Sequence, residues 1–493
     1  LCAVESAAMT LRPTTPTPAA LTLAIVVGLA HVCAAQEPVD TAMVARIRAE
    51  GYERSKVLET FDHLVNVIGP RLTASPAFKT AVDWTTRHLT ALGLDNVHTE
   101  PWDFGRGWTL QRFSVEMVEP RYMPLMGYPK AWSASTRGAI TAAPLWAPTL
   151  ADLKAKAGQL PQAIVMTRPI QEDFIREDRA PASGDLRREG GGPPSEAARR
   201  EAQEATTLLQ EERAGVTLEP NLGEHGTIFV TGRDGGPDAV PGVVLASEHY
   251  NLIARLLRQG VPVKLTVNVQ GAFQEDDRRA YNVIADIAGA DPRIGREIVM
   301  VGAHLDSWHS GTGATDNADG VSTAMEAFRI LKALGVKPRR TIRLALWGGE
   351  EQGLLGSRAY VKAHLTGDAQ QTARDDYSVY FNLDNGATPI AGFYLEGNAA
   401  FEPIMNAWLA PFADLGATVT TLGAIGQTDH LSFKAVGIPG FQAVQDYRNY
   451  DVRTHHTNVD TFERVNPESL KQAAVVMASV LYHAAMRDAK IPR

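Results

Sequence analysis

Cysteine is nearly absent from this sequence. Its two cysteines, Cys2 and Cys33, both lie in an N-terminal segment that we expect to be removed, so the mature protein would have neither a disulfide nor a thiolate metal ligand. A metal ion would therefore have to be held by histidine, aspartate and glutamate.

Clusters of basic residues are missing as well. The chain has 48 Lys and Arg against 56 Asp and Glu, a formal net charge of -8, and no segment concentrates basic side chains as phosphate binding requires. This argues against a nucleic-acid partner and favours small or peptide substrates. Hydrophobic residues at 44% and charged residues at 21% are close to soluble globular averages, and 493 residues suffice for two or three structural units.

The apolar run near the N-terminus is too short for a membrane span. Residues 19–30 follow Arg12 and precede three small residues, the pattern of a secretory signal peptide, and they fall short of the roughly 20 residues that cross a bilayer. We predict a signal peptide at 1–35 and an exported protein, periplasmic or extracellular, that does not stay on the membrane after cleavage. A membrane anchor and a lipoprotein attached through Cys33 are the alternatives, and Met9 is a second candidate start.

Three patterns follow one another along the remaining chain. Residues 44–94 have helical apolar spacing, interrupted at Gly69 and Pro70. Residues 123–271 contain short apolar strands, predicted at 163–167, 227–231 and 263–269, around a charged stretch in which 196–212 reads as a solvated helix. From about residue 278 onward, strands and helices alternate regularly.

This alternation predicts an α/β sheet with parallel strands. The expected strands are residues 298–303, 341–347, 379–383 and 440–444, and the expected helices between them are 321–334, 354–364 and 401–415. Ligands of such sheets bind at the carboxyl ends of the strands, so the polar residues that directly follow each apolar run are the first candidates for chemistry.

Potential metal ligands stand at these positions. His304 ends the first strand, Asp306 is placed to accept from its second ring nitrogen, and Asp316 in the next loop could bridge two ions. Taken alone, His304 could be an ordinary strand-end histidine and Asp316 a helix N-cap.

The later strands strengthen the metal interpretation. Glu350 and Glu351 follow the second strand, and adjacent carboxylates of this kind suggest one metal ligand and one general base, although a solvated acidic turn is the alternative. Asp384 follows the third strand, and His455 and His456 lie downstream. Nitrogen and oxygen donors at successive strand ends form a set that suits zinc.

Together these motifs resemble those of the co-catalytic zinc peptidases of family M28. The resemblance covers nearly the whole mature chain. It implies a zinc-exopeptidase fold, α/β, with a mixed, largely parallel central sheet flanked by helices and an inserted domain like the protease-associated domain. The implied boundaries are 36–122 for the N-terminal part of the catalytic domain, 123–271 for the insertion and 272–493 for the part with the di-zinc site.

The resemblance also implies a role for each motif residue. Two zinc ions would share Asp316; His304 and Asp384 would complete one site, and Glu351 and His456 the other. Glu350 would be the general base for a zinc-bridging water, with Asp306 as a further catalytic residue. The Asp316–Asn317 peptide bond would be cis.

Substrate contacts are less strongly indicated. His455 would line the pocket, and His430 would either contact substrate or be a surface histidine behind a helix-capping aspartate. Some family members have a tyrosine that stabilises the oxyanion, but Ile425 stands at that position here. Zinc, His430 or a tyrosine such as Tyr447 or Tyr450 would then stabilise the oxyanion.

The expected function is hydrolysis of dipeptides and short peptides with free amino termini. The alternatives are a carboxypeptidase that recognises the free C-terminus, a single-zinc acyltransferase that cyclises N-terminal glutamine, and a receptor-like relative without activity. A homodimer is expected from the resemblance alone.

Overall fold

The computed structural model describes residues 37–180, 195–236, 239–367, 370–384 and 386–493. The expected signal peptide, with Cys2 and Cys33, lies outside these residues. Among the helices of the described ranges, none is long and apolar enough to cross a membrane.

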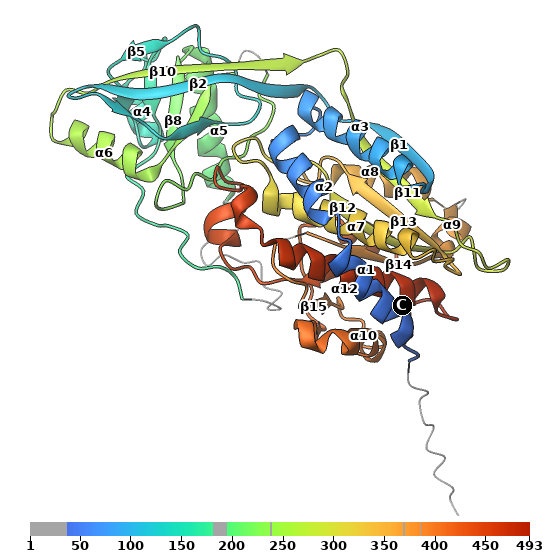
Figure 1. Cartoon of the computed structure of the whole chain (residues 1–493). Helices are drawn as coiled ribbons and strands as arrows, with labels where there is room; N and C mark the ends of the chain where they lie inside the picture. Colours follow the sequence, from blue (N-terminus) through green and yellow to red (C-terminus); the bar gives the residue numbers. More distant parts are fainter. Residues whose placement is uncertain (1–36, 181–194, 237–238, 368–369, 385) are drawn as a thin grey trace, which may run out of the picture. The chain divides into compact units, whose positions relative to one another are not determined.

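The central element is an eight-stranded mixed sheet (Figure 1). Its strands, in spatial order, are β1 (Asp95–Asp103), β11 (Arg279–Ile287), β13 (Thr341–Trp347), β12 (Ile298–His304), β14 (Tyr377–Asn382), β17 (Gly440–Val444), β15 (Gly392–Tyr394) and β16 (Val419–Thr421). The four strands β13, β12, β14 and β17 run parallel. Strands β1 and β11 pair antiparallel with their neighbours, and β15 pairs antiparallel with β17 but parallel with β16. The mixed sheet and its four predicted parallel strands are thus confirmed.

Helices cover both faces of this sheet. Alternate residues of β12 enter two cores, with Val299 and Val301 on one face and Ile298 and Met300 on the other. The first face carries α1 (Thr41–Glu53), α2 (Val57–Asp62), α3 (Pro76–Ala91), α7 (Asp319–Ala333), α10 (Glu402–Leu409) and α12 (Pro467–Met486). The second carries α8 (Leu355–His364) and α11 (His430–Lys434).

Local sequence explains the N-terminal helices. The side chain of Asp40 caps α1, and Ser75 caps α3, whose first residue is a proline. The predicted break at Gly69 is confirmed, because a short π-helical turn (His63–Ile68) ends there with Gly69 at φ 79°.

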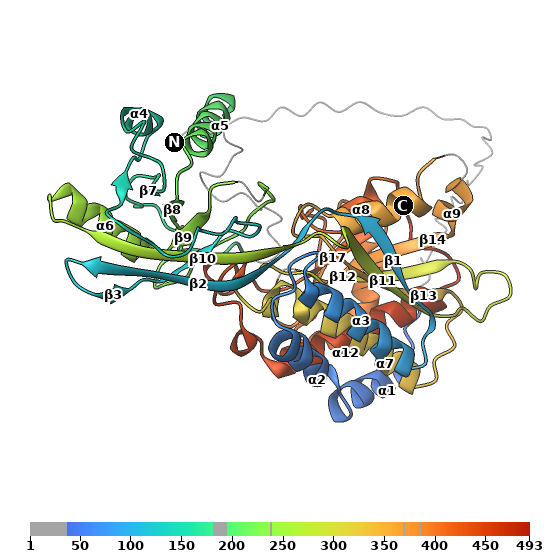
Figure 2. The ribbon, with the colours of Figure 1, turned by 90° about the horizontal axis from the view of Figure 1, so that it is seen from above.

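Residues 107–274, here called the inserted region, lie between β1 and β11 in the chain and form two further sheets. The antiparallel sheet contains β3 (Met123–Pro124), β2 (Gly107–Glu119), β10 (Lys264–Gln274) and β5 (Ile140–Ala142), and Figure 2 shows β2 and β10 side by side. The other sheet contains β4 (Gly127–Pro129), β9 (Gly242–Leu245), β8 (Val216–Pro220), β7 (Ile164–Met166) and β6 (Leu145–Trp146).

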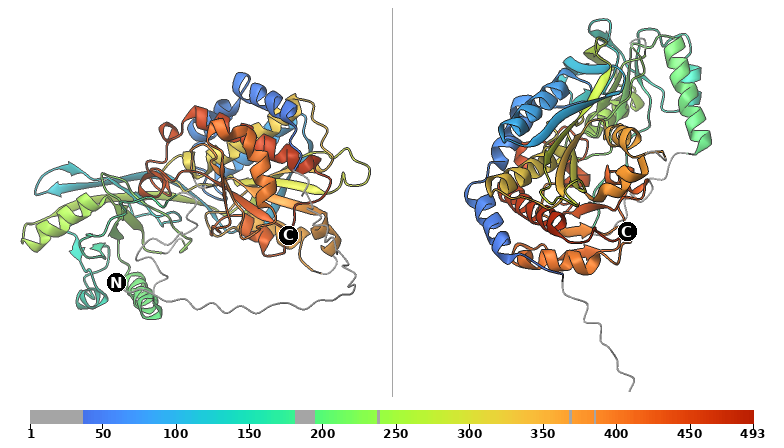
Figure 3. Two further views of the ribbon diagram at one scale, coloured as in Figure 1. Left: turned by 90° about the horizontal axis from the view of Figure 1, so that it is seen from below. Right: turned by 90° about the vertical axis from the view of Figure 1, so that its right-hand side faces the viewer.

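Helices complete the inserted region: α4 (Leu150–Ala155), α5 (Glu196–Glu211) and α6 (Ser247–Arg258). The solvated helix predicted at 196–212 is confirmed as α5, green in Figure 3, in which only Leu209 is buried. The strand predicted at 227–231 is wrong. That apolar segment joins neither sheet and instead makes an isolated bridge between Phe229 and Thr457.

Candidate metal centre and catalytic site

The candidate residues meet at one edge of the central sheet. His304 is the last residue of β12, Glu350 and Glu351 follow β13, and Asp384 follows β14. Because β13, β12 and β14 are parallel neighbours, their carboxyl ends lie together, as ligand sites of α/β sheets require. The loop after β12 adds Asp316, and the loop after β17 adds His456.

His304 stands between two carboxylates. Its Nε2 lies 3.1 Å from Oδ1 of Asp316 and 3.5 Å from Oδ1 of Asp384. All three side chains are buried, and their ligand atoms lie within 4.8 Å of one another. Burial alone would lower the pKa of His304, but the charges of Asp384 and Glu350 raise it well above its ordinary value.

The second ring nitrogen of His304 is held by Asp306. Nδ1 lies 3.0 Å from the main-chain oxygen of Asp306 and 3.6 Å from its carboxylate. The sequence suggested the carboxylate as the acceptor, whereas the carbonyl is the nearer one. With Nδ1 engaged in this way, Nε2 is the atom left to face the carboxylates.

The Asp306 carboxylate instead positions the glutamates. It accepts the main-chain N–H of Glu350 at 3.2 Å and of Glu351 at 3.3 Å, and the hydroxyl of Thr73 donates to it at 2.8 Å. One buried carboxylate thereby fixes the start of the loop that follows β13. Its carbonyl meanwhile orients His304, so Asp306 connects two strand ends.

Asp316 faces two histidines. Oδ1 lies near His304, and Oδ2 lies 3.3 Å from Nε2 of His456. In the part of the chain that the structure describes, Oδ2 of Asp316 has no hydrogen-bond partner. The Asp316–Asn317 peptide bond is cis, as predicted, and the Asn317 side chain donates to the carbonyl of Leu383 at 2.8 Å.

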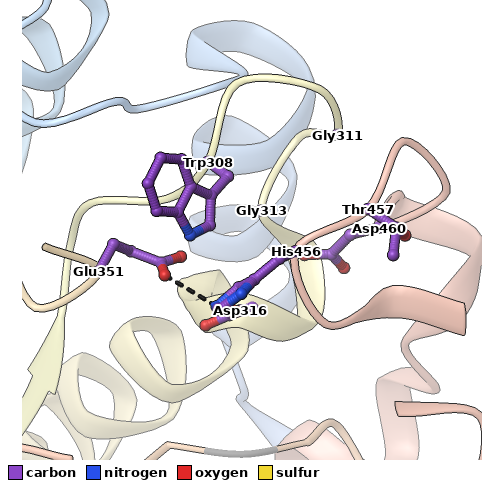
Figure 4. A pocket seen from close by; sticks show the side chains of 8 residues that line it. All are labelled: Trp308, Gly311, Gly313, Asp316, Glu351, His456, Thr457 and Asp460. Atoms are coloured by element: carbon purple, nitrogen blue, oxygen red, sulfur yellow. Dashed lines mark ion pairs between the residues drawn. The ribbon is translucent and has the colours of Figure 1, made fainter. Parts of the chain in front are cut away.

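His456 also faces Glu351 (Figure 4). Its Nε2 lies 2.9 Å from Oε2 of Glu351, and no described residue hydrogen-bonds Oε1 of that glutamate. Burial and the charge of Asp316 raise the pKa of Glu351 to about 7, against the opposing effect of His456. The pocket at this point is lined by Trp308, Gly311, Gly313, Asp316, Glu351, His456, Thr457 and Asp460.

Glu350 directly precedes Glu351 after β13, and its carboxylate interacts electrostatically with His304. Its side chain is buried, and burial together with Asp384, Asp429 and Glu351 raises its pKa well above the ordinary value, while His304 acts in the opposite direction. So many buried acids in one place are costly unless positive charge balances them. The available donors are carboxylate oxygens, some of them without a hydrogen-bond partner, and imidazole nitrogens. This donor set fits divalent cations such as zinc.

The three predicted substrate contacts lie in different surroundings. His455 stacks on the ring of Tyr450 at 4.9 Å and lies 3.8 Å from the ring of His456. Tyr447 is buried beneath the guanidinium of Arg179. His430 is completely buried with Nε2 3.2 Å from Glu396, so its interpretation as a surface histidine is wrong.

Sequence reasoning missed two buried charges that shape the site. Asp460 accepts the N–H of Thr315 at 2.7 Å, one residue before Asp316, and burial raises the pKa of Asp460 to about 7. Arg71 is completely buried and donates to the carbonyls of Leu64, Gly69, Leu305, Thr312 and Gly313. Arg71 directly follows Gly69 and Pro70, and Asp460 lies four residues after His456, so closeness to residues already singled out was the available signal.

Comparisons with known proteins find relatives that are peptidases. Residues 282–481 match the family described as Peptidase family M28. The chain is 26% identical to Carboxypeptidase Q of Bos taurus over 452 residues, and this match covers 91% of this chain and 89% of the relative. It is 31% identical over 202 residues to Aminopeptidase YwaD of Bacillus subtilis (strain 168), covering 39% of this chain and 42% of the relative.

A solved structure extends the likeness to the fold. The crystal structure of a Peptidase M28 precursor from Shewanella amazonensis SB2B is 26% identical, with a TM-score of 0.70, and the match covers 92% of this chain and 98% of that one.

Proposed function

Because this chain belongs to peptidase family M28 and is a metallopeptidase, we propose that it is an exported exopeptidase that uses two zinc ions to hydrolyse dipeptides and short peptides. The observation that carries the proposal is the pair of half-sites joined by Asp316, whose two carboxylate oxygens face different histidines. The names of the relatives, a carboxypeptidase and an aminopeptidase, support an exopeptidase.

We assign the zinc ligands by half-site. His304 and Asp384 would hold one ion, Glu351 and His456 the other, and Asp316 would be shared. His455 is also within reach of Asp316, but the 2.9 Å approach of Glu351 to His456 favours His456 as the ligand. When bound, the two ions supply positive charge that lowers the pKa of water and polarises the scissile carbonyl.

Glu350 would move the proton. An Oε atom of its carboxylate takes a proton from the attacking water and delivers it to the leaving amine nitrogen, so that one peptide bond and one water become a carboxylic acid and an amine. Asp306 holds the main chain of Glu350, which keeps the base in place during both transfers. Burial excludes bulk water from this exchange.

Tyr447 and His455 would line the substrate side. Ile425, which replaces the oxyanion tyrosine of some relatives, belongs to the same buried cluster as Tyr447. We therefore propose Tyr447 as the hydroxyl that compensates for Ile425. His430 would act on the substrate side only through Glu396, its hydrogen-bond partner.

The proposal has three further parts. Residues 1–35 would direct export, the inserted region would be a domain like the protease-associated domain, and the protein would form a homodimer. The dimer is open to a direct test by light scattering of the purified protein.

A dipeptide panel tests the activity. With two zinc equivalents bound, free dipeptides should be cut and their N-acetylated counterparts spared, because a substrate with a free amino terminus is expected. Release of free amino acid is the measurement. Equal cleavage of both series would instead indicate recognition of the C-terminus, and cyclisation of an N-terminal glutamine substrate by protein with one bound zinc would indicate the acyltransferase.

Metal removal should destabilise the protein. Without cations the buried acids around Asp316 repel one another, so chelation is expected to lower the melting temperature and zinc to restore it. Zinc at about 100 times its dissociation constant would contribute about 2.7 kcal/mol. Magnesium, which prefers oxygen ligands and retains its waters, is the control and should restore little. Equal melting temperatures with and without zinc would argue against the proposed centre.

A further inference from the structure

The loop that carries His455 and His456, residues 446–460 and here called the histidine loop, is fastened from outside the central sheet. It connects β17 to the segment before α12 and contains only a short π-helical turn (Tyr450–Thr454). Its main-chain atoms contact the inserted region at two separate places, and the Arg453 side chain adds a further contact by donating to the carbonyl of Glu224 and the hydroxyl of Thr227.

The first contact holds His456 itself. The N–H of Val230 donates to the carbonyl of His456 at 3.1 Å, and Phe229 bridges Thr457. Asn458 closes this contact, because its N–H donates to the carbonyl of Ile228 and its side-chain oxygen accepts the N–H of Ile228 at 2.7 Å. Residues 227–231, which join no sheet, therefore pair with the main chain around His456, the candidate metal ligand.

The second contact holds the π-helical turn. The carboxylate of Asp178 accepts the N–H of Asn449 at 2.7 Å and of Val452 at 2.9 Å. Arg179 forms a two-pronged ion pair with Asp451, at 2.6 Å from Nη2 to Oδ1 and 2.8 Å from Nε to Oδ2. The side chains of this pair are only 13% and 8% exposed, so the pair is shielded from solvent.

Ring contacts continue from Arg179 to the metal pocket. Its guanidinium carbon lies 4.3 Å from the centre of the Tyr447 ring and 5.9 Å from that of Tyr450. Tyr450 stacks on His455, and His455 contacts His456. A change at Arg179 can thus reach His456 through side chains in direct contact.

The backbone of His456 needs such support. Its φ is 63°, in the left-handed region that residues with a Cβ rarely occupy, and it persists where the surroundings enforce it. His456 must nevertheless point at both Glu351 and Asp316 to complete the half-site shown in Figure 4.

We propose that the inserted region braces the histidine loop and that Arg179 is a positioning residue for His456. The inference rests on the proposed function, because it assigns to the inserted region the task of keeping the Glu351–His456 half-site ready for its metal ion. The His304–Asp384 half-site is built on β12 and β14 and does not need the brace.

Arg179→Met tests the brace, with Arg176→Met as the matched control. Arg176 lies in the same segment and forms an ion pair with Glu224, but its side chain is 61% exposed and the pair lies on the surface. Two readouts are measured on the full chain: hydrogen exchange of peptides covering 446–460 in the metal-free protein, and the dissociation constants of the first and second zinc equivalents by competition with a chromophoric chelator.

We expect Arg179→Met to speed hydrogen exchange in 446–460. The dissociation constant of the second zinc equivalent should rise about 10- to 100-fold, while that of the first should stay within about twofold of wild type. Arg179→Lys keeps the positive charge but cannot bind the Asp451 carboxylate through two nitrogens, so it should recover part of both effects. Arg176→Met should change neither the hydrogen exchange nor the zinc dissociation constants.

Unchanged exchange in Arg179→Met would overturn the brace. Faster exchange in this variant with an unchanged dissociation constant for the second zinc equivalent would overturn the positioning role of Arg179. If the wild-type protein binds fewer than two zinc ions, the proposed function fails, and hydrogen exchange alone still decides whether the brace exists.

Discussion

Glu350→Gln is expected to lower kcat on a free dipeptide by about 10²- to 10⁴-fold and to leave two zinc ions bound, because glutamine has nearly the shape of glutamate but cannot accept the proton of the attacking water. The main-chain N–H of residue 350 still donates to Asp306 in the variant, so the loop stays in place. The measurements are kcat from amino-acid release and zinc content by elemental analysis.

Two further variants make this expectation specific. Glu351→Gln should lose affinity for the second zinc equivalent, since Glu351 faces His456 and would be a ligand. Glu211→Gln, on the exposed face of α5, should change neither kcat nor zinc content. A Glu350→Gln protein that retains more than about a tenth of wild-type kcat with both ions bound would remove Glu350 as the base.

The strand ends could be predicted because burial leaves a simple pattern. Residues 341–347 and 440–444 were predicted with the bounds that the structure has, since strands covered on both faces are continuous apolar runs between polar loops. Once the strands were placed, parallel pairing brought His304, Glu351 and Asp384 to one edge. The largest part of the candidate site therefore followed from local pattern and topology.

What could not be predicted depends on contacts between distant segments. Residues 227–231 look like a strand, but their partner is the histidine loop more than 200 residues away, and no local pattern identifies it. Arg179 likewise reads as one charge in a polar stretch. His430 is buried and its ring pairs with Glu396, a contact that spacing along the chain does not reveal.

Arg71 also escaped local reasoning, and its replacement should have the largest effect on stability. Its guanidinium is completely buried and donates to five main-chain carbonyls, at distances from 2.8 to 3.2 Å. Two of these carbonyls, those of Thr312 and Gly313, belong to the loop that leads to Asp316. Burial lowers the pKa of Arg71 to about 10, so it stays charged at neutral pH.

Arg71→Met should lower the free energy of unfolding by about 3 to 5 kcal/mol, because it fills similar space and leaves buried carbonyls without donors. Urea unfolding followed by circular dichroism measures the loss, and zinc affinity should fall with it, since the loop before Asp316 loses its anchors. Arg71→Lys, with one compact ammonium, should lie in between. Arg87→Met, on the exposed face of α3, is the control and should stay within about 0.5 kcal/mol of wild type. If Arg71→Met unfolds at the same urea concentration as Arg87→Met, the carbonyls find other donors and Arg71 does not organise the loop.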